Sequence, residues 1–193
     1  GLLDYTRGSV SIAEGPNRGR DIGPFMTLVG DMIGDKVYDL IGHFHGKKSL
    51  SSSEAMGRNW RDFLLGTLLG EPGDISKIFG LFAADEKLGL VFAEDRHAVG
   101  WTENRAIAEN IAGRLNPRPV LSDFSVFPLG NMFWARPAAL RSLWNASFTW
   151  SDYPVEPILD DGTILHAVER MLPGICESVG MRWATVYKRG LSW

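Results

Sequence analysis

Apolar and polar residues alternate along the chain with two periods, which divide it into short strands and amphipathic helices. Apolar runs of about four to eight residues are typical of strands, whereas apolar residues three and four positions apart are typical of helices. Strands are predicted over residues 9–13, 37–44, 88–93, 127–136 and 183–187. Helices are predicted over residues 25–33, 54–69, 75–82, 103–115, 137–143 and 164–172.

The order of elements at the start of the chain predicts parallel strands. Residues 9–44 follow the pattern strand, polar loop, helix, strand, and such a unit joins two parallel strands of one sheet. We therefore expect an α/β fold with a mostly parallel central sheet and helices on both faces. No repeat, low-complexity segment or linker interrupts the 193 residues, which predicts a single domain over 1–193.

Composition narrows the functional classes. Hydrophobic residues make up 45% and charged residues 22% of the chain, and the net charge of −3 provides no general basic field for nucleic acid. The single cysteine, Cys176, excludes an internal disulfide and a multi-cysteine zinc site, and it fits a cytoplasmic setting. No apolar run approaches the ~20 residues of a membrane span. The chain opens with Gly1 rather than methionine, so we expect an excerpt of a longer polypeptide.

A basic loop follows the predicted strand 37–44. His43 and His45 are two residues apart on that strand, so their side chains point to the same face. Gly46 frees the backbone to turn, and Lys47 and Lys48 supply donors suited to phosphate oxygens. The alternative is an exposed turn with solvated lysines. Ligands of α/β sheets bind where strands end in polar loops, which favours a binding role.

A second polar loop precedes the first predicted helix and carries Asn17, Arg18, Arg20 and Asp21. In a parallel unit this loop lies at the same edge of the sheet as the histidines and lysines, so the two loops would share one crevice. The alternative is a surface loop in which Asp21 pairs with an arginine.

An aromatic stretch is the third candidate. Asn131, Phe133 and Trp134 lie in the predicted strand 127–136, and aromatic faces stack well on pyranose rings or on a base. Most such aromatic residues belong to the core, which is the alternative. Arg61 is ambiguous, because it lies close in sequence to the basic loop.

The predicted helix 164–172 has an apolar stripe and a polar face. His166, Glu169 and Arg170 lie on the polar face, and Asp161 lies at the helix start, where the helix dipole stabilises a carboxylate. The alternatives are a plain N-cap for Asp161 and a surface pair for His166 and Arg170.

Together these stretches resemble the rhamnan synthesis protein F family of bacterial glycosyltransferases. The similarity runs in order from about Asn17 to Gly180, through blocks that are individually weak and jointly specific. The blocks are Asn17-Arg-Gly-Arg-Asp21, His43-x-His45-x-Lys-Lys-Ser49, Trp60-Arg61, Phe127-Pro-x-Gly-x-Met-Phe-Trp-Ala-Arg-Pro137 and Asp161-Gly-Thr-x-x-His-Ala-x-Glu-Arg170.

The resemblance implies a GT-A-like transferase domain without its first strand–helix unit. It would move a deoxyhexose, typically rhamnose, from a nucleoside-diphosphate donor onto a bacterial surface polysaccharide such as an O-antigen, at the inner face of the membrane. Asp161 would be the base of an inverting reaction, with Glu169, His166 and Asp160 as further catalytic candidates. The donor site would comprise Asn17, Arg18, Arg20, Asp21, His43, His45, Lys47 and Lys48. The site for a glycan acceptor, free or lipid-linked, would comprise Arg61, Asn131, Phe133, Trp134 and Arg170.

Metal use and two other functions stay open at this point. Two imidazoles alone provide few ligands for a metal ion, so we expect no dedicated metal ligands. Dependence on Mg²⁺ or Mn²⁺ is left open. One rival function is a non-catalytic carbohydrate- or nucleotide-binding module. The other is a metallohydrolase that uses His43, His45, His166 and Asp161, which requires these side chains to meet around one ion.

Overall fold

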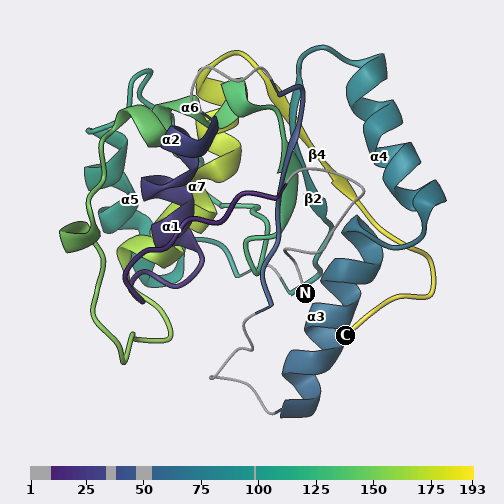
Figure 1. The fold of residues 1–193 in the computed structure, drawn as a ribbon, viewed down its shortest axis with the longest axis horizontal. Helices are drawn as coiled ribbons and strands as arrows, with labels where there is room; N and C mark the ends of the chain where they lie inside the picture. Colours follow the sequence, from purple (N-terminus) through teal and green to yellow (C-terminus); the bar gives the residue numbers. More distant parts are fainter. Residues whose placement is uncertain (1–9, 34–37, 47–53, 98) are drawn as a thin grey trace.

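The computed structural model describes residues 10–33, 38–46, 54–97 and 99–193, which form a mixed α/β fold (Figure 1). Within these ranges no helix is long and apolar enough to cross a membrane. The elements are, in order, α1 (Ile22–Thr27), α2 (Val29–Ile33), β1 (Ile41–His43), α3 (Glu54–Leu68), α4 (Pro72–Ala84), β2 (Leu88–Ala93), the 3₁₀ turn η2 (Thr102–Asn104), α5 (Arg105–Ala112), β3 (Phe133–Ala135), α6 (Pro137–Asn145), the 3₁₀ turn η3 (Trp150–Asp152), α7 (Ile164–Ser178) and β4 (Arg182–Val186).

The sheet is mixed, so the prediction of a mostly parallel sheet is wrong. Its strands lie in the order β1-β3-β2-β4, with β3 antiparallel to both neighbours and only β2 and β4 parallel. The long stretch 113–132 returns the chain to the edge where β2 ends, since Phe92 pairs with Phe133 at the start of β3. β1 and β2 thus run in the same direction without being neighbours.

The predicted strand–helix–strand unit at the start of the chain does not form. Residues 10–13 are exposed and belong to no strand, because no neighbouring chain pairs with them within the described ranges. The strand predicted over 37–44 shortens to β1, which pairs antiparallel with β3. The strand predicted over 88–93 is confirmed as β2, and the closing strand is β4.

Helices cover both faces of the sheet, as predicted (Figure 1). Leu90, Phe92 and Phe133 face α1, α5, α6 and α7 in the larger core. Val91 and Met132 face α3 and α4 in a second core. The alternation of side chains along β2 therefore divides its apolar run between two layers, which explains why all six residues of the strand are buried.

Two predicted helix starts need correction. The helix predicted over 75–82 starts earlier than expected. The helix begins at Pro72, and Asp74 accepts a hydrogen bond from the backbone of Glu71 in a capping box. The helix predicted over 103–115 begins instead as the 3₁₀ turn η2 and continues as α5 to Ala112.

Gly89 in the middle of β2 provides a test of this packing. A Cβ atom there would lie 2.7 Å from Sγ of Cys176 and 2.9 Å from the Cβ atoms of Ala139 and Met181, so the elements packed on β2 would have to move apart. We expect Gly89→Ala to lower the free energy of unfolding by about 2–3 kcal/mol in urea titrations.

The control is Gly80→Ala in α4, where nothing lies within 4 Å of an added Cβ. That change should raise the free energy of unfolding by about 0.5–1 kcal/mol, since alanine is the better helix former. Equal effects of both substitutions would contradict the described packing around β2.

Candidate functional site

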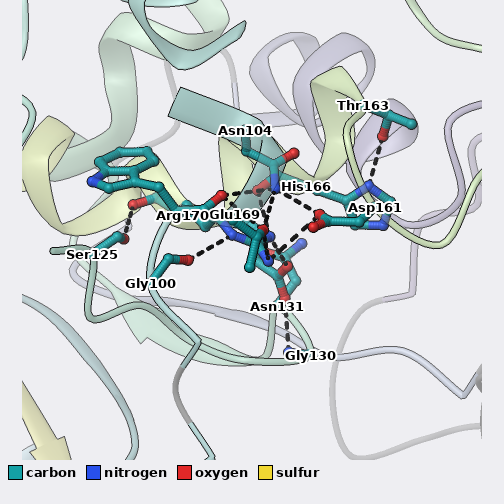
Figure 2. Close-up of polar contacts among 12 residues, drawn as sticks. Gly100, Asn104, Ser125, Gly130, Asn131, Asp161, Thr163, His166, Glu169 and Arg170 are labelled. Carbon is teal, nitrogen blue, oxygen red and sulfur yellow. Dashed lines mark hydrogen bonds and ion pairs between the residues drawn. The ribbon is translucent and has the colours of Figure 1, made fainter. Parts of the chain in front are cut away.

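Polar side chains meet inside the molecule at the start of α7 (Figure 2). They come from the turn before α1, the end of β1, the turn before β3, η2 and α7. Hydrogen bonds or ion pairs link them. We call them the α7 polar network: Asp21, His43, His45, Thr102, Asn104, Gly130, Asn131, Asp161, Thr163, His166, Glu169 and Arg170.

Glu169 is the buried acid of the network, with 9% of its surface exposed. Its Oε1 accepts a hydrogen bond of 2.7 Å from the backbone N–H of Gly130, and its Oε2 lies 3.7 Å from the Arg170 guanidinium. Burial raises the pKa of Glu169 to about 8, with Asp21 adding to this effect, although Arg170 and the backbone N–H groups of Gly130 and Asn131 oppose it. The carboxyl group is therefore protonated for most molecules at neutral pH.

Arg170 holds the loop before η2 against α7. Its guanidinium donates to the carbonyl oxygens of Gly100 at 2.9 Å and His166 at 3.0 Å and to Oγ1 of Thr102 at 3.2 Å. Its side chain is 6% exposed and lies over the ring of Phe127. Since these contacts use the guanidinium, its role is structural and electrostatic, and the predicted contact with acceptor would require it to exchange partners.

Asp161 is not an N-cap, because α7 begins after Thr163 and Asp161 lies two residues earlier. Asn104 donates to its Oδ1 at 2.6 Å, and Arg170 lies 3.6 Å from the same atom. Burial raises the pKa of Asp161, but the hydrogen bonds from Asn104, Thr102 and the Gly162 backbone, together with Arg170, outweigh it and lower the pKa to about 2. With 33% of its side chain exposed, Asp161 is an ionised, fixed and accessible carboxylate.

His166 lies beside Asp161 on the first turns of α7. Its Nδ1 is hydrogen-bonded to Oγ1 of Thr163 at 2.9 Å. Burial lowers the pKa of His166, and the positive charges of Arg170 and Arg20 lower it further, although Asp161 opposes them. The ring is therefore neutral at neutral pH.

The turn before β3 connects the two histidines to the network. Gly130 and Asn131 both have positive φ, at 82° and 53°, which turns both carbonyl groups toward β1. Nδ1 of His43 donates to the Asn131 carbonyl at 2.6 Å, and Nε2 of His45 donates to the Gly130 carbonyl at 2.8 Å. The side-chain amide of Asn131 donates to Asp21 at 2.7 Å.

The histidines differ in their surroundings. His43 packs between Phe25 and Phe133, and burial lowers its pKa despite the nearby charge of Asp21. His45 is more exposed, at 23% of its side chain, and its Nε2 lies 3.7 Å from a carboxylate oxygen of Asp21. Nδ1 of His45 is buried and has no hydrogen-bond partner in the part of the chain that the structure describes.

Half of the site residues predicted from the sequence thus lie in one network, although the expected parallel unit does not exist. They are Asp21, His43, His45, Asn131, Asp161, His166, Glu169 and Arg170. The polar face of α7 is also not a surface face, because Glu169 and Arg170 are both buried.

The other predicted site residues lie elsewhere. Arg18 donates to the Tyr153 carbonyl at 2.6 Å and Arg20 to the Ile158 carbonyl at 3.2 Å, so both arginines bind backbone, while Asn17 is exposed. Arg61 lies on α3, 3.6 Å from Asp62. Lys47 and Lys48 fall outside the described residues.

The aromatic pair predicted to stack on a sugar is divided between the two cores. Phe133 is fully buried and packs on His43, so it is a core residue in this arrangement. Trp134 points to the opposite face, where its Nε1 donates to the Leu68 carbonyl at 2.9 Å and Phe44 and Phe79 pack on it. Phe133 has no exposed face, whereas Trp134 is half-buried with two aromatic neighbours.

Asn104, Gly100 and Thr102 belong to the site although no sequence pattern indicates them. Asn104 is completely buried and donates to Asp161, and Thr102 has a φ of 46°, which is rare for threonine. Neither apolar periodicity nor a motif indicates Asn104, so only its position opposite Asp161 reveals its role.

Metal binding finds little support in the described geometry. Among the described residues no group of three or more His, Cys, Asp or Glu side chains is placed to hold a metal ion. The metallohydrolase arrangement of His43, His45, His166 and Asp161 is therefore not assembled there, although all four belong to the network.

The fold and the site together define a mixed α/β domain with a buried acid–arginine pair next to an accessible carboxylate. A sequence profile of the rhamnan synthesis protein F family matches residues 2–179, and the chain belongs to that family. It is also 35% identical over 185 residues to the uncharacterized protein WxcX of Xanthomonas campestris pv. campestris strain B100, and equally to WxcX of a second strain. The match covers 93% of this chain but 26% of WxcX, so the chain spans about a quarter of that relative. No solved structure matches.

Glu169 makes stability depend on pH. Its pKa is raised from 4.5 to about 8 on folding, so its contribution is fully present below pH 4.5 and is lost as pH rises toward 8. Glu169→Gln stays neutral and can still accept from Gly130. We expect the variant to gain roughly 3–5 kcal/mol in unfolding free energy relative to wild type between pH 4.5 and pH 8.

Urea titrations at pH values across this window measure the effect. Glu86→Gln, at an exposed position before β2, is the matched control and should follow the wild-type curve. Parallel curves for wild type and Glu169→Gln would show that Glu169 ionises normally in the folded protein.

Proposed function

We propose that this chain is the sugar-transferring domain of a bacterial polysaccharide-synthesis protein. It would move a deoxyhexose, typically rhamnose, from a nucleoside-diphosphate donor to a hydroxyl of a growing glycan, with inversion at the anomeric carbon. Membership in the rhamnan synthesis family supports the substrate class. The observation that carries the reaction type is the pair Asp161 and Glu169, two carboxyl groups of one network whose pKa values lie near 2 and near 8.

Asp161 is the proposed base. Asn104 fixes its carboxylate, the hydrogen bonds from Asn104 and Thr102 together with the Arg170 charge keep it ionised, and a third of its side chain is open to an acceptor hydroxyl. A carboxylate with so low a pKa is a weak base in the ground state. It is adequate for a transfer in which the hydroxyl proton leaves late, after positive charge has developed on the sugar and acidified the attacking oxygen.

Glu169 has a different proposed role, which is to position the turn before β3. As a neutral, buried acid it accepts the Gly130 N–H and brings the Gly130 and Asn131 carbonyl groups against the histidines. It places no second negative charge beside Asp21, which matters because the donor's diphosphate must approach the same region.

The leaving diphosphate is assigned to the end of β1. His45 stands there, held by the hydrogen bond from its Nε2 to the Gly130 carbonyl, directly before Gly46 and the two lysines at 47 and 48. Cationic and N–H donors aimed at a leaving group stabilise the charge that develops on it in the transition state. No dedicated metal ligands are part of this proposal, and a Mg²⁺ or Mn²⁺ ion carried by the diphosphate is compatible with it.

Removal of the base is the first test. We expect Asp161→Asn to reduce turnover of the full-length protein by at least about 100-fold, with donor affinity and fold retained. Diphosphate release and calorimetric donor binding measure the two quantities. A wild-type rate in Asp161→Asn, combined with an inactive Glu169→Gln, would transfer the role of base to Glu169.

The dependence of wild-type turnover on pH distinguishes Asp161 from Glu169 as the base. A base with a pKa near 2 stays ionised, so turnover should not fall through protonation of the base between pH 8 and pH 5. If Glu169 were the base, turnover would instead fall about tenfold for each pH unit below 8.

The diphosphate site has its own test. We expect Lys48→Ala to weaken nucleoside-diphosphate binding by about 1.5–3 kcal/mol, the range for a lost charge-assisted hydrogen bond. Lys87→Ala, at an exposed position before β2, is the control and should bind like wild type. Equal affinities of all three proteins would exclude Lys48 from the donor site.

A further inference from the structure

A cavity of about 630 Å³ opens at the carboxyl ends of the parallel strands β2 and β4. The segments that follow these strands, residues 94–97 and 187–193, form its walls together with Phe63 of α3. β1 runs in the same direction as β2, so this is also the edge of the sheet at which His45 lies. Cavities of this size hold small ligands or one to three sugar units.

The C-terminal segment is anchored to the rest of the domain (Figure 1). Lys188 forms an ion pair of 2.7 Å with Asp74 of α4. Leu191 packs on Gly66 of α3, where an added Cβ would lie 2.9 Å from it. The rings of Trp193 and Trp60 lie 5.5 Å apart. Contacts with two helices therefore shape this wall of the cavity before any ligand binds.

Asp95 fixes the floor of the cavity. Its side chain is 3% exposed, and its Oδ1 accepts from the backbone N–H of His97 at 2.9 Å and from the His97 ring at 3.0 Å. Its Oδ2 accepts from the indole N–H of Trp193 at 3.0 Å. The imidazole and the indole, with ring centres 4.4 Å apart, are thus held by one buried carboxylate.

The remaining groups of the cavity are free to bind. Tyr187 is 71% exposed. Arg96 and Arg189 line the cavity, and in the described part of the chain neither makes a hydrogen bond or an ion pair. An open phenol ring next to guanidinium donors and the carboxylate of Glu94 suits a pyranose, whose apolar face stacks on the ring while its hydroxyl groups bind the charged groups.

Trp60 connects this cavity with the α7 polar network. Its indole packs on the ring of Trp193 and also on Gly130, where an added Cβ would lie 2.8 Å from Cζ2 of Trp60. Gly130 is the residue that donates to Glu169. A chain of direct contacts thus runs from the cavity to the proposed transfer site.

We propose that this cavity is the binding subsite for the acceptor glycan, holding sugar units that lie beyond the one that receives the transferred residue. This inference rests on the proposed transferase function. It replaces the sugar-stacking role expected for Phe133 and Trp134, because Phe133 is fully buried and Trp134 packs against Phe44 and Phe79. The donor is assigned to the end of β1, so the two ligands occupy neighbouring places on one edge of the sheet.

Nuclear magnetic resonance of the full-length protein tests the assignment with a rhamnose trisaccharide as the probe. The indole N–H signal of Trp193, identified from its loss in Trp193→Phe, should shift and saturate during the titration. Tyr187→Ala and Arg189→Ala should each weaken trisaccharide binding by about fivefold or more. The matched controls are Tyr38→Ala, which precedes β1, and Arg141→Ala on α6, both exposed, and they should bind like wild type.

Three results would overturn the assignment. The first is that the protein does not bind the trisaccharide. The second is that Tyr187→Ala and Arg189→Ala bind it as tightly as wild type. The third is that uridine diphosphate displaces it, which would make the cavity a nucleotide site. Failure of the proposed function would look different. Asp161→Asn would then turn over at the wild-type rate, or the wild-type protein would not bind nucleoside diphosphate, while the Trp193 signal would still respond to the trisaccharide.

Discussion

The burial of Glu169 and Arg170 side by side at the start of α7 is the constraint on which the site depends. Neither group is tolerated inside a protein without partners. Arg170 therefore draws the loop at Gly100 and Thr102 against the helix, and Glu169 draws in the turn at Gly130. Two loops that are separate in sequence are thereby fixed to one helix, and truncation of either side chain would leave a backbone partner buried without its hydrogen bond.

The buried pair positions the catalytic candidates through the hydrogen bonds of the two loops. The turn at Gly130 and Asn131 directs two carbonyl groups at His43 and His45, and the loop beyond Gly100 carries the Asn104 that holds Asp161. An acid kept neutral and an acid kept ionised thus follow from one buried pair. Such separation of pKa values is what acid–base chemistry requires, and it also has a stability cost that a purely structural core would avoid.

The sequence predicted the elements better than their directions. The apolar run of β2 identified a strand, and the family blocks contained most of the residues that meet in the α7 polar network, although their meeting in one network was not predicted. The direction of β3 was not predictable, because it depends on where the stretch 113–132 returns to the sheet. The burial of Glu169 and Arg170 was hidden as well, since helical periodicity assigns charged positions to the solvent side, and only tertiary contacts reverse this.

The central claim is that sugar transfer takes place at the α7 polar network, and a structure of the full-length protein with a bound nucleoside diphosphate tests it most directly. We expect the diphosphate at the carboxyl end of β1, next to His45, with the Asp161 carboxylate facing the open side on which a sugar would project. Diphosphate bound in the cavity beside Trp193, or at the opposite edge of the sheet, would contradict it.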